Sequence, residues 1–222
     1  MAGKFITFEG GEGAGKSTQA EALARKLDAF GIGVVLTREP GGSPGAEIIR
    51  HIILSGAAKS FGEEGETLLF AAARADHVET LIRPSLVRGK WVVCDRFHDS
   101  TRVYQGVLGK VSRGLIRAIE KATIGDAMPE LTFILDVPAT VGLARARERR
   151  GTAPPDRFEK EDRAFHEALN AAFRNAAEAE PQRCVLIDGN RPPDIIASDV
   201  WRYVRNRLHP ETAPMTVEDI AR

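Results

Sequence analysis

Five short apolar runs recur along the chain, with longer segments of helical periodicity between them. The runs are residues 5–8, 34–36, 91–94, 131–135 and 184–187. Each is continuous and rich in β-branched or aromatic side chains, as is typical of strands buried in a parallel sheet. The first intervening segment, residues 17–30, is amphipathic and ends at Gly31. The pattern predicts repeated βαβ units, and hence an α/β fold with helices on both faces of a five-stranded parallel sheet.

Ligands of such sheets bind at the carboxyl ends of the strands. We therefore expect chemistry directly after Phe8, Leu36, Cys94 and Leu135. Two segments interrupt the alternation. Residues 146–163 are dense in arginine and glutamate and predict a lid between two helices, whereas the Pro-containing residues 209–222 predict a peripheral tail to a single domain over residues 1–208.

Charge and composition argue against several classes of protein. The 222 residues include 31 Lys and Arg and 31 Asp and Glu, so no basic excess favours nucleic acid or a membrane surface as partner. No apolar run approaches the roughly 20 residues that span a bilayer, and no signal segment precedes the first run. Cys94 and Cys184 lack metal-ligand spacing and are interpreted as buried, reduced thiols. A cytoplasmic location is the expectation.

The first predicted strand runs into a glycine-rich loop that matches G-x-x-x-x-G-K-[ST]. The loop residues are Gly10, Gly11, Glu12, Gly13, Ala14, Gly15, Lys16 and Ser17, followed by Thr18. Backbone N–H groups of such a loop surround phosphate oxygens, and the next helix begins there. Lys16 is expected to reach the β- and γ-phosphates of ATP, and Ser17 to bind Mg²⁺. The motif predicts a nucleoside triphosphate site but does not choose among GTPases, ATPases and kinases.

Asp95 and Arg96 follow the third predicted strand. An acid at that position can hold Mg²⁺, directly or through water, and the fixed charge of Arg96 then has to face a different anion. The pair predicts two phosphate-bearing substrates, with a structural ion pair as the alternative interpretation.

An aromatic residue and an arginine follow the second predicted strand, and further arginines lie in and beside the predicted lid. Phe70 and Arg74 lie one helical turn apart, so they can stack on a base and bind its edge. Taken alone, Phe70 is better explained as a core residue, and only the surrounding motifs favour the base-stacking role. Arginines also crowd the predicted lid, at positions 145, 147, 149, 150 and 157. A solvated helical face is the simpler interpretation of any one of them, but phosphoryl transfer needs positive charge on the migrating group.

Together these residues resemble the thymidylate kinase family over nearly the whole chain, up to about Leu208. The matching segments are residues 8–18, 37–42, 70–74, 95–97, 100–101, 104–106 and 156–159. The resemblance implies the three-layer P-loop kinase fold with a short arginine-rich lid, and a homodimer. It also implies Mg²⁺-dependent transfer of the γ-phosphoryl of ATP to dTMP, giving dTDP for dTTP synthesis.

The resemblance also implies roles for individual residues. Phe70 would stack on thymine and Arg74 would contact its edge. The rest of the base pocket would be lined by Ser100, Thr101 and Gln105, while Tyr104 would crowd the ribose 2′ position. Around the dTMP phosphate would lie Arg38, Arg50 and Arg96. Glu12 would face the deoxyribose 3′-OH or metal-bound water, with Glu39 nearby.

The residue after Glu12 departs from one branch of the family. Some members carry a catalytic arginine there, and this chain has Gly13. The resemblance is therefore to the bacterial type, whose catalytic arginine sits in the lid, and Arg149 and Arg157 are the candidates beside Lys16 and Arg96. A second departure is Phe97, where many members carry Tyr or His, so this chain lacks a hydrogen-bonding group at that position.

No general base is expected. The acceptor is a phosphate monoester whose second pKa is near 6, so it is mostly a dianion at neutral pH. Two alternatives remain from the sequence. A deoxynucleoside kinase would need a carboxylate near a sugar 5′-OH, for which Glu39 is the candidate. A P-loop switch or regulatory ATPase would hydrolyse ATP without any monophosphate acceptor.

Overall fold

The computed structural model describes residues 3–152 and 158–210. One parallel sheet holds the five predicted strands, which are β1 (Phe5–Gly10), β2 (Val34–Arg38), β3 (Trp91–Asp95), β4 (Leu131–Asp136) and β5 (Cys184–Asp188). Their order across the sheet is β2-β3-β1-β4-β5. Each strand continues one or two residues past its apolar run. The predicted fold class is confirmed.

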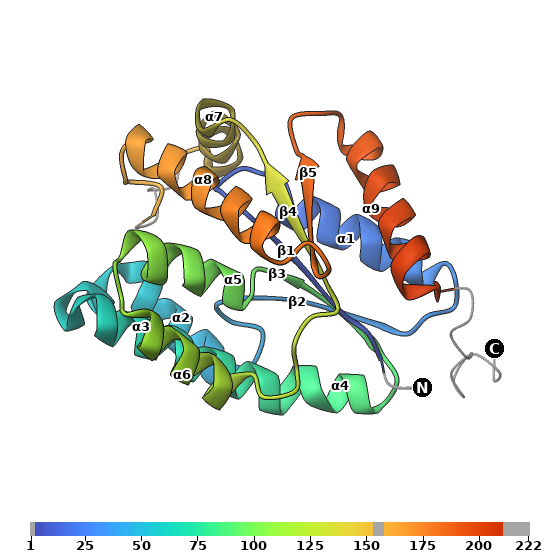
Figure 1. The fold of residues 1–222 in the computed structure, drawn as a ribbon, viewed down its shortest axis with the longest axis horizontal. Helices are drawn as coiled ribbons and strands as arrows, with labels where there is room; N and C mark the ends of the chain where they lie inside the picture. The colour runs from blue at the N-terminus through green and yellow to red at the C-terminus, as the bar shows by residue number, and fades with distance from the viewer. Residues whose placement is uncertain (1–2, 153–157, 211–222) are drawn as a thin grey trace.

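Helices cover both faces of this sheet (Figure 1). Before β3 the structure has α1 (Lys16–Asp28), α2 (Pro44–Ser55), the 3-10 helix η1 (Ala57–Phe61), α3 (Gly62–His77), η2 (Val78–Ile82) and α4 (Arg83–Val87). After β3 come α5 (His98–Thr101), η3 (Arg102–Leu108), α6 (Arg113–Thr123), α7 (Ala139–Arg150), α8 (Arg163–Ala179) and α9 (Pro193–Leu208). On one face α1 packs beside α9, and on the other α4, α5 and α8 contact the strands.

The register of the sheet brings the ends of three strands together. Phe8 of β1 lies opposite Asp95 of β3, and Arg38 of β2 lies opposite the same residue. The carboxyl ends of β1, β2 and β3 therefore meet at one edge of the sheet. The loops that follow them start side by side.

The core lies mainly around the three central strands. Phe8 and Phe133 stack there with ring centroids 5.3 Å apart. The expectation that every strand is fully buried is wrong for the two edge strands, where Leu36 is 45% exposed and Leu186 is 41% exposed. Both residues lie on outermost strands, which have a neighbouring strand on one side only.

Both cysteines are buried free thiols, as expected from the sequence. Over residues 3–152 and 158–210 the structure contains no helix with the length and apolar character of a membrane span.

Candidate active site

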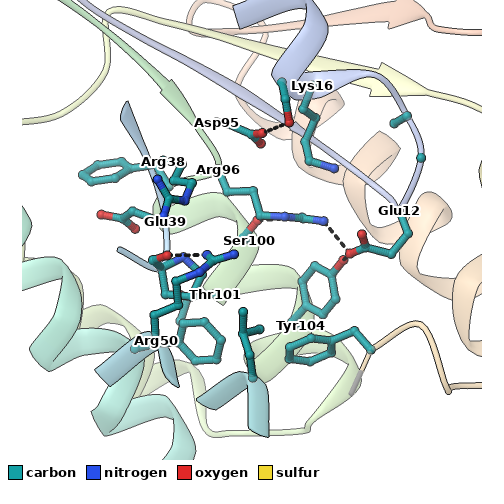
Figure 2. A pocket seen from close by; sticks show the side chains of 18 of the residues that line it. Glu12, Lys16, Arg38, Glu39, Arg50, Asp95, Arg96, Ser100, Thr101 and Tyr104 are labelled. Atoms are coloured by element: carbon teal, nitrogen blue, oxygen red, sulfur yellow. Dashed lines mark hydrogen bonds and ion pairs between the residues drawn. The ribbon is translucent and has the colours of Figure 1, made fainter. Parts of the chain in front are cut away.

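A cavity of about 530 Å³ opens at the carboxyl ends of β1, β2 and β3. It collects nearly all the residues expected from the sequence: Glu12, Gly13, Ala14, Gly15, Lys16, Ser17, Thr18, Arg38, Glu39, Arg50, Phe70, Arg74, Asp95, Arg96, Ser100, Thr101, Tyr104, Gln105 and Arg149. Figure 2 shows that these side chains reach the cavity from several separate elements. Arg157 lies outside the described residues.

The glycine-rich loop connects β1 to α1 and forms one wall. Lys16 begins α1, and its Nζ donates hydrogen bonds to the carbonyl oxygens of Gly10, at 3.1 Å, and Gly11, at 2.7 Å. Burial, together with the charge of Arg96, lowers the pKa of the Lys16 ammonium to about 8. Nearby carboxylates oppose that shift, so an added anion would favour the charged form further.

Gly13 is the loop residue with the least room. Its φ of 66° lies in the left-handed region. A Cβ at this position would lie 1.9 Å from the carbonyl oxygen of Gly142 in α7. The loop and α7 therefore touch backbone to backbone, and no side chain fits between them.

Asp95 lies on the side of the cavity near Lys16 (Figure 2). The Ser17 hydroxyl donates a hydrogen bond to Oδ2 of Asp95. A hydroxyl and a carboxylate are the oxygen ligands that Mg²⁺ takes, and the ion keeps several waters besides. The donor set therefore fits Mg²⁺ bound through few protein groups. In the described part of the chain no cluster of three or more His, Cys, Asp or Glu residues forms a larger metal site.

Arg96 crosses the cavity from the end of β3 and points at the glycine-rich loop (Figure 2). Its Nη2 donates to Oε1 of Glu12 at 2.6 Å, and its Nη1 donates to the Gly10 carbonyl oxygen at 3.1 Å. The Tyr104 ring lies under the guanidinium, and its hydroxyl also donates to Glu12 Oε1, at 3.1 Å. Burial works against the Glu12 carboxylate, but Arg96 and Lys16 outweigh it and lower the pKa of Glu12 to about 2.

Arg74 is the most deeply buried cation of the site, with 2% of its surface exposed. Its Nε donates to Oε2 of Glu39 at 2.8 Å, and its Nη2 donates to the Thr101 hydroxyl at 3.0 Å. The other Glu39 oxygen lies 3.0 Å from Nδ1 of His77. Both oxygens of Glu39 are thus occupied by cationic or polar nitrogens. Nη1 of Arg74 is buried and has no hydrogen-bond partner among the described residues, so this donor is available to a ligand.

The remaining expected substrate residues lie around the same opening. Arg38 pairs with Glu47 at 2.9 Å, and Arg50 donates to the Pro40 carbonyl oxygen at 2.5 Å. Figure 2 places both arginines across the cavity from Glu12. Phe70 lines the cavity half-buried, which settles that its side chain is not simply part of the core.

The arginines of α7 point in different directions. Arg149 lines the cavity while its side chain stays 65% exposed, and it lies 4.0 Å from Glu159. Arg150 pairs closely with Glu159. Arg145 points instead at the loop between β5 and α9, where it donates to the Gly189 carbonyl oxygen at 3.0 Å. Of the described arginines at positions 145–150, only Arg149 lines the cavity.

The structure adds one residue that sequence reasoning missed, assigns a role to Phe97 and corrects one expectation. Glu9 is fully buried beside Arg96, and only its position at the end of a buried strand could have indicated it. Phe97 is fully buried and places its ring under the Arg74 guanidinium, so its side chain has an apolar role. The expectation of chemistry after Leu135 is wrong, because Asp136 pairs with Arg174 and the cavity has no lining residue from that loop.

The arrangement can hold two anions at once. Lys16 and the loop amides can form one anion site, and Arg96, Arg38 and Arg50 supply further cations to the same cavity. Asp95 lies near Lys16 and accepts the hydrogen bond of the Ser17 hydroxyl. Such a geometry suits a triphosphate with its metal ion facing a second phosphate-bearing molecule.

Comparisons with known proteins agree with this chemistry. The family model described as thymidylate kinase matches residues 8–200. The chain is 60% identical over 211 residues to a thymidylate kinase of Bradyrhizobium diazoefficiens, which covers 95% of this chain and 92% of the relative. It is 61% identical to one from Rhodopseudomonas palustris, over 93% of this chain and 90% of the relative. A crystal structure of thymidylate kinase from Ehrlichia chaffeensis superposes with a TM-score of 0.73 at 33% identity, covering 92% of this chain and 99% of that one.

Proposed function

The chain belongs to the thymidylate kinase family, whose members transfer the γ-phosphoryl of ATP to dTMP. We propose which of its residues bind the donor, which bind the acceptor and which stabilise the transferred group. The reaction joins a phosphate oxygen of dTMP to the γ-phosphorus of ATP and releases ADP, giving dTDP for dTTP synthesis. One observation carries the division of roles. Lys16 of α1 and Arg96 from the end of β3 both line this cavity, and both donate to the Gly10 carbonyl oxygen of the glycine-rich loop, so two anions bound by them would lie side by side.

The donor lies on the glycine-rich loop. The backbone amides of residues 10–18 cradle the ATP phosphates, and Lys16 exchanges its two carbonyl partners for β- and γ-phosphate oxygens. Ser17 and Asp95 would hold Mg²⁺, and the ion would supply positive charge beside the phosphates. Support comes from their direct hydrogen bond and from the preference of Mg²⁺ for oxygen ligands.

The acceptor occupies the other half of the cavity. Its phosphate is held by Arg96 with Arg38 and Arg50, and its base stacks on Phe70. The unpartnered Nη1 of Arg74 supports a hydrogen bond to the base edge. The rest of the base pocket is formed by Ser100, Thr101 and Gln105, with Tyr104 against the sugar.

No residue has to remove a proton. The second pKa of the acceptor phosphate is near 6, so at neutral pH it attacks as a dianion. Glu39, the carboxylate that a hydroxyl-phosphorylating kinase would need, already binds Arg74 and His77 through both oxygens. Catalysis is therefore in-line positioning of two anions while cations cancel their repulsion.

Arg149 supplies the mobile positive charge from a lid formed by residues 146–163. Its exposed guanidinium at the cavity mouth, within 4.0 Å of Glu159, supports this role. Arg157 is the second candidate. Arg149→Ala and Arg157→Ala should each lower kcat far more than dTMP affinity, by about 100-fold or more if the charge acts in the transition state.

Arg147→Ala is the matched control for this experiment. Arg147 is an exposed arginine on the same helix and does not line the cavity, so its replacement should leave kcat unchanged. Normal turnover by both the Arg149 and the Arg157 variants would refute the lid assignment. The same coupled assay, run with dTMP, thymidine or no acceptor, separates this reaction from a deoxynucleoside kinase and from a regulatory ATPase.

A homodimer and a cytoplasmic location complete the proposal. Three exposed apolar side chains support a partner surface on the paired helices α2 and α3: Ile48 is 66% exposed, Ile52 37% and Leu68 54%. Sedimentation of the protein and of Ile48→Glu tests the dimer, which the charged variant should dissociate. The cytoplasmic location is supported by the use of ATP and dTMP as substrates.

A further inference from the structure

Glu9 is a buried acid that the reaction described above does not use. It lies near the carboxyl end of β1, with no exposed surface, and it does not line the cavity. Its Oε1 accepts the backbone N–H of Phe97 at 2.8 Å and that of Ser100 at 3.2 Å. Its Oε2 accepts the Ser100 hydroxyl at 2.6 Å. All three hydrogen bonds thus come from residues 96–100, which we call the turn that follows β3.

The same turn contains an unusual backbone conformation. Arg96 has a φ of 69°, which is uncommon for a residue other than glycine. Its own N–H still donates to the Phe8 carbonyl oxygen at 2.8 Å, so the chain remains in the sheet up to this residue. The next N–H, that of Phe97, turns to Glu9 instead. Glu9 therefore binds the chain at the point where it leaves the sheet.

The Arg96 side chain depends on this turn in a second way. Its Nη1 donates to the Ser100 hydroxyl oxygen at 3.2 Å, and that hydroxyl donates in turn to Glu9. Both the backbone and the guanidinium of Arg96 are thereby linked to one carboxylate. Left-handed backbone at a non-glycine residue persists only where surrounding contacts hold it.

We propose that Glu9 is a positioning residue, whose ionised carboxylate holds the turn after β3 so that Arg96 faces the acceptor phosphate. The inference rests on the role given to Arg96 under the proposed function. Glu9 itself touches neither substrate, because it is sealed from the cavity by the turn that it holds.

The carboxylate can change its charge near neutral pH. Burial, and then the neighbouring Asp99 of α5, raise the pKa of Glu9 to about 7, against the opposing effects of Ser100 and Arg96. Lys16 of α1, Cys94 of β3 and Cys184 of β5 also lie within its electrostatic reach. The ionised form accepts all three hydrogen bonds. The protonated form carries a hydrogen on one oxygen, which disturbs the bonds accepted there.

Positioning and direct charge effects have opposite signs. A negative Glu9 weakens the positive field at Arg96, so electrostatics alone would make a neutral Glu9 bind the acceptor phosphate more tightly. Positioning predicts the reverse, because the neutral group holds the turn less well. The direction of the change therefore distinguishes the two effects.

Glu9→Gln is the test variant, since it keeps the size of the side chain and removes its charge. At pH 8 we expect kcat/KM for dTMP to fall about tenfold, because hydrogen bonds to a charged group are lost. At pH 6 the wild type and the variant should have nearly the same kcat/KM for dTMP. The titration of dTMP affects both enzymes equally. The ratio of the wild-type kcat/KM to that of the variant therefore reports the titration of Glu9 alone. Affinity for thymidine, which has no phosphate for Arg96, should stay unchanged.

Glu130→Gln is the matched control. Glu130 accepts the Phe5 N–H at 2.7 Å, so it too is a carboxylate bound to β1, but at the end opposite the site. Its replacement should leave kcat/KM and the pH profile unchanged. The inference would be overturned if the ratio of wild-type to Glu9→Gln kcat/KM were equal at pH 6 and pH 8. It would also be overturned if this variant bound dTMP more tightly than the wild type.

Thymidine 5′-sulfate keeps the inference testable if Glu9→Gln does not fold, because its sulfate does not titrate between pH 6 and pH 8. Its affinity for the wild-type protein should rise with pH through about 7. A constant or falling affinity would overturn the inference. Failure of the wild-type protein to phosphorylate dTMP would instead refute the proposed function, so the two failures are distinguishable.

Discussion

Replacing Gly13 by alanine puts a methyl group where the glycine-rich loop has no room. The new Cβ would lie 1.9 Å from the carbonyl oxygen of Gly142, closer than folded proteins allow. Loop and helix α7 would have to separate by about 1 Å in a close-packed region. The same residue has a φ of 66°, which alanine adopts only at a cost.

The expected loss of stability follows from these two terms. A left-handed conformation costs alanine about 1 kcal/mol, and overpacking of a tight contact costs about 1–3 kcal/mol. Their sum, about 2–4 kcal/mol, lowers the melting temperature of a chain of this length by roughly 10 °C. ATP affinity should fall as well, because the displaced loop carries the phosphate-binding amides.

Two further glycines separate the terms. Gly31→Ala carries the conformational cost alone, since its φ is 73° and no atom lies within 4 Å of the added Cβ. Gly142→Ala carries the steric cost alone, with its Cβ 2.4 Å from the Glu12 carbonyl oxygen, less about 1 kcal/mol gained in helix propensity. Thermal melts with and without ATP measure all three. If Gly13→Ala melts no lower than Gly31→Ala, the steric reasoning is refuted.

Three other predictions concern buried groups. Burial lowers the pKa of His98 to about 3, so the unfolded chain binds a proton that the folded chain does not as the pH falls below 6.5. Urea unfolding should show wild type losing about 2 kcal/mol relative to His98→Phe between pH 7 and pH 5. Arg74→Lys should destabilise the protein by about 2–3 kcal/mol and raise the KM for dTMP in the coupled assay, because lysine cannot reproduce the fork that binds Glu39. Burial raises the pKa of Cys94 and Cys184, so a thiol reagent such as DTNB should label neither at pH 8 until guanidinium is added.

Much of the fold could be predicted because each buried parallel strand appears in the sequence as a short continuous apolar run. The apolar runs located all five strands, but each strand extends into polar residues such as Asp95 that a hydrophobic pattern excludes. The strand order could not be read in this way, since it depends on pairings between distant segments. Exposure of Leu36 follows from that order, because β2 lies at an edge.

The residues of the site also differ in whether a local sequence pattern could identify them. The glycine-rich loop, Asp95 and Arg96 were found because each follows a strand with residue types that suit phosphate or metal. Glu9 was missed because a single acid at a strand end has no distinctive pattern, and its partners lie 88 or more positions away. The contact of Gly13 with Gly142 is equally non-local. The sequence indicated which residues suit the chemistry, whereas the groups that hold them in place are brought together only by the fold.

Two arginines of the site are paired with carboxylates. Two highly charged substrates need several cations, yet the sequence has 31 basic and 31 acidic residues. The structure pairs the site arginines with carboxylates, Arg74 with Glu39 and Arg96 with Glu12. Without such partners, cations held in a buried cavity would repel one another and lose solvation. Under the proposed function, an acceptor phosphate that binds Arg96 has to displace Glu12, and a doubly charged phosphate competes with a single carboxylate where a neutral nucleoside cannot. The pairing thus favours a monophosphate acceptor over the nucleoside.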